Sequence, residues 1–192
     1  MTTRESPAGV LVAGVGNVFL GDDGFGVECV RRLRRFTAPQ VPDGVEIADI
    51  GVRGVHLAYQ LLDGYRLLVL VDAVSRGGPP GTVHLIEADT GPVEPSATPA
   101  LDGHRMGPDA VLALLATLSA GTGGTPPERI LVVGCEPLSL AEGMGLSAPV
   151  AAAVDGAVRL ILRLLAEAEE APAPAGARGG RSEREASSCS ER

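Results

Sequence analysis

Short apolar runs alternate with amphipathic stretches along most of this chain. The runs are rich in Val, Leu and Ile and predict strands over residues 10–15, 45–50, 67–74, 82–88 and 129–135. Elsewhere apolar positions recur every three or four residues, which predicts helices near residues 25–36, 52–62, 108–118 and 147–165. This order is typical of a single-domain α/β fold, a three-layer sandwich in which helices cover both faces of a mostly parallel, twisted five-stranded sheet.

Two of the apolar runs predict details of the sheet. Residues 67–74 (LLVLVDAV) form the most apolar run and are expected at the centre of the sheet. The linker SRGGPPG leads from this run to the next strand and is too short for a parallel crossover, which takes about a dozen residues. We therefore expect one antiparallel strand, over residues 82–88.

The chain divides into a folded body and a tail. Residues 1–167 carry the periodic pattern and are expected to form the α/β domain. Residues 168–192 are rich in Ala, Pro, Gly, Arg and Glu without apolar periodicity, which predicts a disordered tail. Within the body, residues 88–107 form a Pro- and Thr-rich stretch that predicts a long surface loop.

Charge and cysteine content argue against several classes of protein. The formal net charge is −8 and no basic stripe is visible, which argues against a nucleic-acid partner. No apolar stretch reaches the ~20 residues that span a bilayer, and the N-terminus lacks a secretory signal, so no membrane partner is expected. Three widely spaced cysteines do not form a disulfide framework. A cytoplasmic protein is the resulting expectation.

The loop after the first strand contains two adjacent acids. Its start, Gly14-Val15-Gly16, begins like a dinucleotide fingerprint, but Phe19 stands where the third glycine should fall. The following Asp22 and Asp23 would also repel a pyrophosphate. Paired acids at the end of a strand suit a cation better, although either one could instead cap the helix that follows.

A third acid and one histidine strengthen the cation hypothesis. Asp72 ends the most apolar run, where a buried carboxylate needs a charge partner, hydrogen bonds or a metal. Because α/β sheets bind ligands at the carboxyl ends of their strands, we expect Asp23 and Asp72 at one edge. His104 lies in a loop that could reach the same edge. Together the three side chains would supply two oxygens and one nitrogen, with coordination positions left open.

The other candidate residues favour structural roles. His56 falls in a predicted helix and His84 in a predicted strand, where a surface or core position is expected for each. Cys29 lies on the apolar side of its helix. Cys135 could pair with His104 as a thiolate nucleophile, but a buried free cysteine is the favoured interpretation.

Four segments of the chain resemble the hydrogenase maturation protease family. They are GVGNVFLGDDGFGV (14–27), LVLVDAV (68–74), DGHRMGPDAVLALL (102–115) and VVGCEPLSLAEGMGLSAPVAAAV (132–154), in order over roughly residues 10–165. The resemblance implies an endopeptidase that removes the C-terminal extension of the large-subunit precursor of a nickel–iron hydrogenase after nickel insertion.

The resemblance also implies roles for individual residues. Asp23, Asp72 and His104 would bind nickel, which the precursor carries; the family often has Glu at the first position. The loop after the second strand would recognise the substrate through Asp49, Gly51 and Arg53, with Val52 where the family usually has Thr. Arg53 would then pair with an acidic group of the substrate, or remain a solvated residue at the start of a helix.

Two other functions stay open at this point. One is a non-proteolytic module that binds or delivers nickel, and the other is a small-molecule, nucleoside-type hydrolase on the same scaffold. The chain contains no Gly-x-Ser-x-Gly elbow and no His-Glu-x-x-His motif that would indicate a familiar hydrolase.

Overall fold

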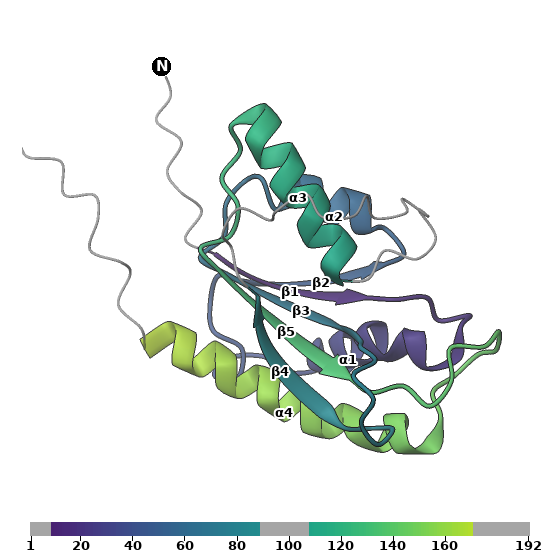
Figure 1. The fold of residues 1–192 in the computed structure, drawn as a ribbon. Coiled ribbons are helices and arrows are strands. Elements are labelled where there is room, and N and C mark those ends of the chain that lie inside the picture. The colour runs from purple at the N-terminus through teal and green to yellow at the C-terminus, as the bar shows by residue number, and fades with distance from the viewer. Residues whose placement is uncertain (1–8, 89–107, 171–192) are drawn as a thin grey trace, which may run out of the picture.

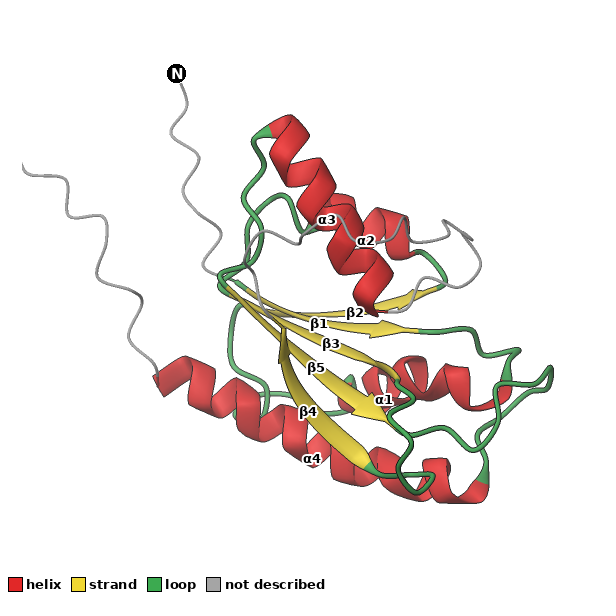
Figure 2. Cartoon of the chain, in the orientation of Figure 1, coloured by secondary structure: helices red, strands yellow, loops and turns green. Residues whose placement is uncertain are grey.

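The computed structural model describes residues 9–88 and 108–170, in which two helices cover each face of a single sheet (Figures 1 and 2). The strands are β1 (Val10–Val15), β2 (Val45–Gly51), β3 (Leu67–Ala73), β4 (Val83–Ala88) and β5 (Arg129–Cys135). The helices are α1 (Phe25–Leu33), α2 (Gly54–Gln60), α3 (Pro108–Thr122) and α4 (Ala148–Glu170), with a short 3-10 turn, η1 (Gly21–Gly24), before α1. The predicted fold class is thereby confirmed.

The order of the strands is β2-β1-β3-β5-β4. β3 is central, as its apolar sequence predicted, and it pairs in parallel with β1 and β5. β4 runs antiparallel, as the short linker before it predicted, but its hydrogen-bonded neighbour is β5 rather than β3. The carboxyl ends of β2, β1, β3 and β5 consequently meet along one edge, which we call the carboxyl edge.

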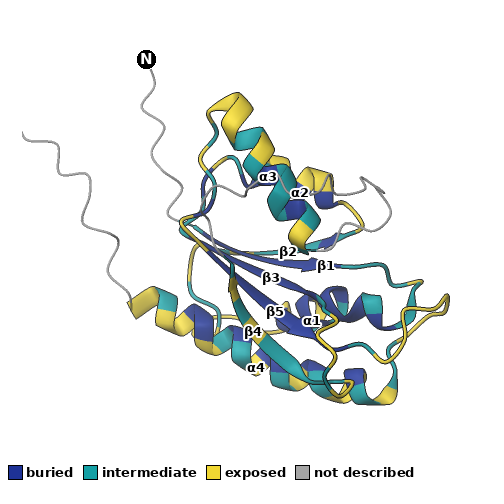
Figure 3. Cartoon of the chain, viewed as in Figure 1, coloured by how far each residue is buried: buried dark blue, intermediate teal, exposed yellow. Residues whose placement is uncertain are grey.

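Each face of the sheet has its own apolar core (Figure 3). On one face α1 and α4 pack on the sheet through Phe25, Cys29, Leu33, Val154 and Ile161, all of them buried. On the other face α2 and α3 cover Leu11, Leu68 and Leu70. β3 is buried along almost its whole length because it contributes alternate residues to both cores.

The helices differ from their predicted ranges mainly at the ends. α1 ends at Leu33, so Phe36, which was expected to continue its apolar face, lies beyond the helix and is 37% exposed. α4 extends to Glu170, three residues into the range predicted for the tail, and Ala168 in this extension still packs against the core. The rest of the tail and almost all of the predicted loop over residues 88–107 lie outside the described residues.

Two glycines let α1 approach the sheet closely. A side-chain carbon added at Gly26 would lie 2.1 Å from the carbonyl oxygen of Val71 and 2.4 Å from that of Val15. One added at Gly14 would lie 2.3 Å from the carbonyl oxygen of Gly26. Because no side chain fits at either position, the start of α1 rests on the backbone of β1 and β3 and holds η1 at the carboxyl edge.

Within residues 9–88 and 108–170, no helix combines the length and the apolarity that crossing a membrane requires.

Candidate active site

Asp23 and Asp72 lie close together at the carboxyl edge. Asp72 is near the end of β3, and Asp23 lies in η1, directly after the neighbouring β1. Gly16 connects the two positions: a side-chain carbon placed there would lie 1.8 Å from the backbone oxygen of Asp23 and 3.5 Å from Oδ1 of Asp72. A glycine with φ of 123° is therefore required where the chain passes between the two acids. The predicted juxtaposition is present.

Asp72 is a buried carboxyl group without a cation among the described residues. It is 3% exposed, and the backbone N–H of Ala73 donates a 2.8 Å hydrogen bond to Oδ1. Burial, and to a smaller extent the negative charge of Asp23, raise the pKa of Asp72 to about 8, although the Ala73 hydrogen bond acts in the opposite direction. A carboxyl group in this situation gains from a positive ion nearby, because the ion would replace the proton as its partner.

Asp23 is half-buried and held by one strong contact. The backbone N–H of Asn17 donates a 2.6 Å hydrogen bond to Oδ2 of Asp23. The Asn17 side chain in turn accepts a 3.0 Å hydrogen bond from the backbone N–H of Phe19. Asp23 is thereby fixed beside Asp72 by the loop after β1, while no ion pair joins it to another described residue.

Asp22, the adjacent acid, has an entirely different role. It is 1% exposed and accepts hydrogen bonds from the backbone N–H groups of Leu138, Ser139 and Ser147 at 2.8, 3.0 and 2.6 Å, and from the Ser147 hydroxyl at 2.9 Å. Burial raises its pKa, but these hydrogen bonds together outweigh burial and lower it. Neither acid caps η1 or α1 through its side chain, so that expectation is wrong. Asp22 instead joins the loop after β1 to the loop after β5.

Glu136 is a fourth carboxylate at this edge, which sequence reasoning missed. It follows β5 and is 5% exposed. The backbone N–H groups of Arg76 and Gly77 donate hydrogen bonds of 2.8 and 3.1 Å to the Glu136 carboxylate. Hydrogen bonding by the backbone of Arg76, and next by that of Gly78, lowers the pKa of Glu136 despite the opposing effect of burial. Its position after an apolar strand is the same signal that identified Asp72.

The four carboxylates therefore form two classes. Asp22 and Glu136 accept several hydrogen bonds each and hold the loops that follow β1, β3 and β5. The carboxyl groups of Asp23 and Asp72 lie next to one another, and each accepts one hydrogen bond from a backbone N–H among the described residues. Among the described residues, the second pair therefore has the fewest partners and is the better placed to bind a cation at the sheet edge.

The third predicted ligand cannot be placed, because His104 lies outside the described residues. Within residues 9–88 and 108–170, no three His, Cys, Asp or Glu side chains form a group that could hold a metal ion. His56 is exposed on α2. His84 lies on β4, where its Nε2 is 3.7 Å from Oε2 of Glu136. Both agree with the structural roles expected for them.

Cys135 is unsuited to act as a nucleophile. It is fully buried at the end of β5, and burial, assisted by the charges of Asp22 and Glu136, raises its pKa to about 11. Only the thiolate is nucleophilic, so this thiol is inert at neutral pH. Cys29 is likewise buried in the core. The favoured interpretation of both cysteines, as buried core residues, agrees with the structure.

The predicted recognition segment forms a turn between β2 and α2. Gly51 adopts a φ of 57°, and its carbonyl oxygen accepts a 3.1 Å hydrogen bond from the N–H of Gly16, which places the turn beside the loop after β1. The Arg53 guanidinium donates to the backbone oxygens of Asp49 and Ile50. The Asp49 carboxylate pairs with Arg31 at 3.5 Å. Arg53 thus stabilises the turn, and its side chain remains exposed.

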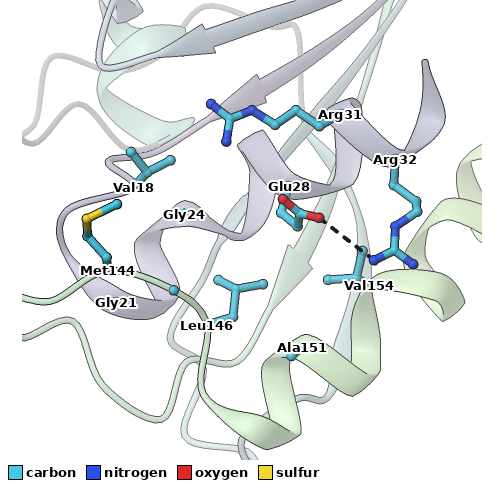
Figure 4. Close-up of a pocket in the computed structure, with 11 residues that line it drawn as sticks. Val18, Gly21, Gly24, Glu28, Arg31, Arg32, Met144, Leu146, Ala151 and Val154 are labelled. Atoms are coloured by element: carbon cyan, nitrogen blue, oxygen red, sulfur yellow. Dashed lines mark ion pairs between the residues drawn. The ribbon is translucent and has the colours of Figure 1, made fainter. Parts of the chain in front are cut away.

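A cavity of about 500 Å³ opens beside Gly24, the residue that follows Asp23 (Figure 4). Its apolar wall contains Val18, Met144, Leu146 and Val154, contributed by the loops after β1 and β5 and by α4. Glu28, Arg31 and Arg32 of α1 line the remaining side, and Glu28 pairs with Arg32 at 3.8 Å. The loops after β1 and β5, together with α1 and α4, therefore enclose a hollow of mixed polarity that adjoins η1 at Gly21 and Gly24.

The sequence is similar to proteins that act in hydrogenase maturation. The family model described as hydrogenase maturation protease matches residues 27–164. The hydrogenase expression/formation protein HupD of Rhizobium leguminosarum bv. viciae is 34% identical over 157 residues, which cover 81% of this chain and 73% of that protein. The corresponding HoxM of Cupriavidus necator is 37% identical over 152 residues, covering 78% and 70%.

Solved structures of maturation peptidases share the fold. The hydrogenase maturating endopeptidase HybD from E. coli superposes with a TM-score of 0.64 at 30% identity, covering 83% of this chain and 93% of that chain. A hydrogenase 2 maturation peptidase from a Thaumarchaeota archaeon superposes with a TM-score of 0.59 at 32% identity, covering 82% and 97%.

Proposed function

The chain belongs to the hydrogenase maturation protease family, an endopeptidase family, and from this premise we propose that it removes the C-terminal extension of a nickel–iron hydrogenase large-subunit precursor. The precursor would carry the nickel ion, and Asp23 and Asp72, with His104, would bind that ion. The observation that carries the proposal is that Asp23 and Asp72 lie together at the carboxyl edge with one hydrogen bond each from the described residues, and that the pKa of the buried Asp72 is raised to about 8.

The chemistry of the donors fits a borderline divalent ion. Carboxylate oxygen and imidazole nitrogen are both common ligands of nickel and its neighbours in the first transition series. Three protein ligands leave coordination positions for the groups by which the precursor already holds the ion. Nickel is then part of the substrate, and the enzyme needs no resident metal of its own.

Recognition of the metal would restrict cleavage to loaded precursor. Without nickel, docking would cover Asp23 and Asp72, which already lie side by side, with a protein surface that supplies no cation, and this further burial is unfavourable for their charged forms. With nickel present, the same two groups gain a partner. The free-energy difference between the two complexes would therefore delay removal of the extension until the metal is in place.

The turn after β2 supports recognition of the precursor chain. Gly51 connects this turn to the loop that holds Asp23, so both segments would contact the substrate together. Arg53 keeps the turn in shape through its hydrogen bonds to backbone oxygens, and its exposed position still permits a contact with an acidic group of the precursor. Family membership argues against the nickel-carrier and nucleoside-hydrolase alternatives. The cytoplasmic location stays a prediction.

The proposal is tested by cleavage of a nickel-loaded large-subunit precursor from the same genome. Asp23→Ala, Asp72→Ala and His104→Ala should each abolish cleavage while the far-ultraviolet circular dichroism spectrum stays that of the parent. Asp43→Ala and His56→Ala change an exposed acid and an exposed histidine outside the site and serve as matched controls that should cleave normally. Cleavage at the parent rate by all three site variants would show that the site is assigned wrongly.

A further inference from the structure

Four large apolar side chains are exposed on the two loops that Asp22 joins. Phe19 is 62% exposed on the loop after β1, and Leu138, Leu140 and Met144 are 59%, 43% and 80% exposed on the loop after β5. We call these four residues the loop patch. Solvent-exposed Phe and Met are costly to leave uncovered, and both residue types are enriched where proteins bind one another.

The loop patch is also poor in charge. Glu142 is the only charged residue within residues 17–21 and 137–147, whereas 21% of the whole chain is charged. Depletion of charge is the compositional feature that distinguishes the centre of a protein–protein interface from the remaining surface. The exposed apolar side chains and the low charge of these two loops therefore both indicate a surface that binds another protein.

The two loops form one preorganised surface. The N–H of Gly21 donates to the oxygen of Gly143 at 2.9 Å, and the N–H of Gly143 donates to the oxygen of Phe19 at 2.9 Å. The hydrogen bonds to the buried Asp22 carboxylate hold the base of the second loop. Because the backbone is already fixed, binding a partner here would cost little ordering entropy.

The loop patch is continuous with the free carboxylates. From Phe19, two hydrogen bonds lead through Asn17 to the Asp23 carboxylate. Met144 also lines the cavity beside Gly24, where Figure 4 shows it next to Val18. Phe19 and Asp23 both lie between β1 and α1, so a protein that brings a metal ion to Asp23 would also reach the loop patch.

We propose that Phe19, Leu138, Leu140 and Met144 form the docking surface for an apolar region of the precursor next to its metal centre, with one apolar side chain of the precursor in the adjoining cavity. The inference rests on the proposed function, which supplies the occupant. In this inference the loop patch provides affinity for the precursor, whereas Asp23 and Asp72 distinguish nickel-loaded from nickel-free precursor. Two separate sets of residues would then control binding and metal recognition.

Steady-state cleavage of nickel-loaded precursor tests this division. The double variant Phe19→Ser/Met144→Ser should raise KM by at least about tenfold and leave kcat nearly unchanged, because its substitutions remove contacts outside the reacting groups. Leu85→Ser changes a side chain that is 47% exposed on β4, away from the two loops, and is the matched control that should keep the parent KM. Unchanged KM in the double variant would overturn the inference.

Direct binding separates this inference from the proposed function. Titration of nickel-free precursor should show about tenfold weaker binding by the double variant than by the parent, because apolar contacts do not require the metal. This result would support the docking surface even if the parent cleaved nothing. Equal binding by the two proteins would contradict it. The inference would also be contradicted if the parent protein formed a dimer, the double variant did not, and both had the same KM. The patch would then bind a second copy of this chain instead of the precursor.

Discussion

At the level of single residues, four carboxylates at one sheet edge have contrasting environments. Asp22 and Glu136 receive enough hydrogen bonds to remain charged when buried. Asp72 receives one, from the next residue, and Asp23 lies beside it. A carboxyl group that the fold buries without compensation is a common mark of a functional site, since the uncompensated group costs stability unless it serves another purpose.

The first prediction concerns the pH dependence of stability in the metal-free protein. The pKa of Asp72 is about 8 when folded and 3.8 in the reference state, so unfolding releases a proton between these pH values. The Asp72 contribution to the free energy of unfolding therefore falls as pH rises through this window, by at most about 1.4 kcal/mol per unit. Urea titrations from pH 5 to 8.5 should show a weaker fall in Asp72→Asn; parallel pH profiles would contradict the assignment.

Asp22 predicts the opposite behaviour. Its lowered pKa stabilises the folded chain above the ordinary pKa of an aspartate, and this contribution is lost as the carboxylate takes up a proton in acid. Asp22→Ala should cost roughly 2–4 kcal/mol at neutral pH, because three backbone N–H groups and a hydroxyl lose their acceptor. Chemical denaturation measures the loss, and a change below about 0.5 kcal/mol would show that these bonds contribute little.

The sequence allowed Asp72 to be singled out but not the division of roles between Asp22 and Asp23. Asp72 ends an apolar run, and that local pattern alone implies burial. The donors to Asp22 are 116 to 125 residues away in the chain, so no local pattern relates them to it. Glu136 could have been found, because it follows β5 as Asp72 ends β3.

At the level of elements, α1 connects the core to the site. Its apolar face packs on the sheet, and its first turn continues η1, which carries Asp23. The hydrophobic period predicted this helix and its buried face, because both follow from local spacing. The pairing of β4 with β5 was not predictable in the same way, since β5 comes after α3 in the chain and inserts between β3 and β4 only in the tertiary fold.

Replacement of Gly26 tests the connection between α1 and the site. Gly26→Ala places a methyl group against the backbone oxygens of Val71 and Val15, which cannot give way like a flexible side chain. We expect α1 to shift, at a cost of roughly 1–3 kcal/mol or more, and cleavage to fall with it. Gly156→Ala on α4, where the nearest atom is 3.9 Å from the added carbon, is the matched control. Equal thermal stability of both variants would contradict the close approach.

At the level of the whole molecule, the fold collects loops from separate strands at one edge and holds them by buried carboxylates. The apolar loop patch lies on the loops after β1 and β5, the cavity opens beside Gly24, and Asp23 lies next to Asp72. Under the proposed function the substrate is a folded protein that carries a metal ion, and this arrangement would let it contact a broad surface and the Asp23–Asp72 pair at the same time.

The central claim is that Asp23 and Asp72 bind an ion that the precursor brings. The most direct measurement is the ratio of affinities for nickel-loaded and nickel-free precursor, determined by equilibrium titration for the parent and for Asp23→Asn/Asp72→Asn. We expect the parent to bind the nickel-loaded form at least about tenfold more tightly, or by 1.4 kcal/mol, and the double variant to bind both forms equally. Equal affinities in the parent, or an undiminished preference in the double variant, would contradict it.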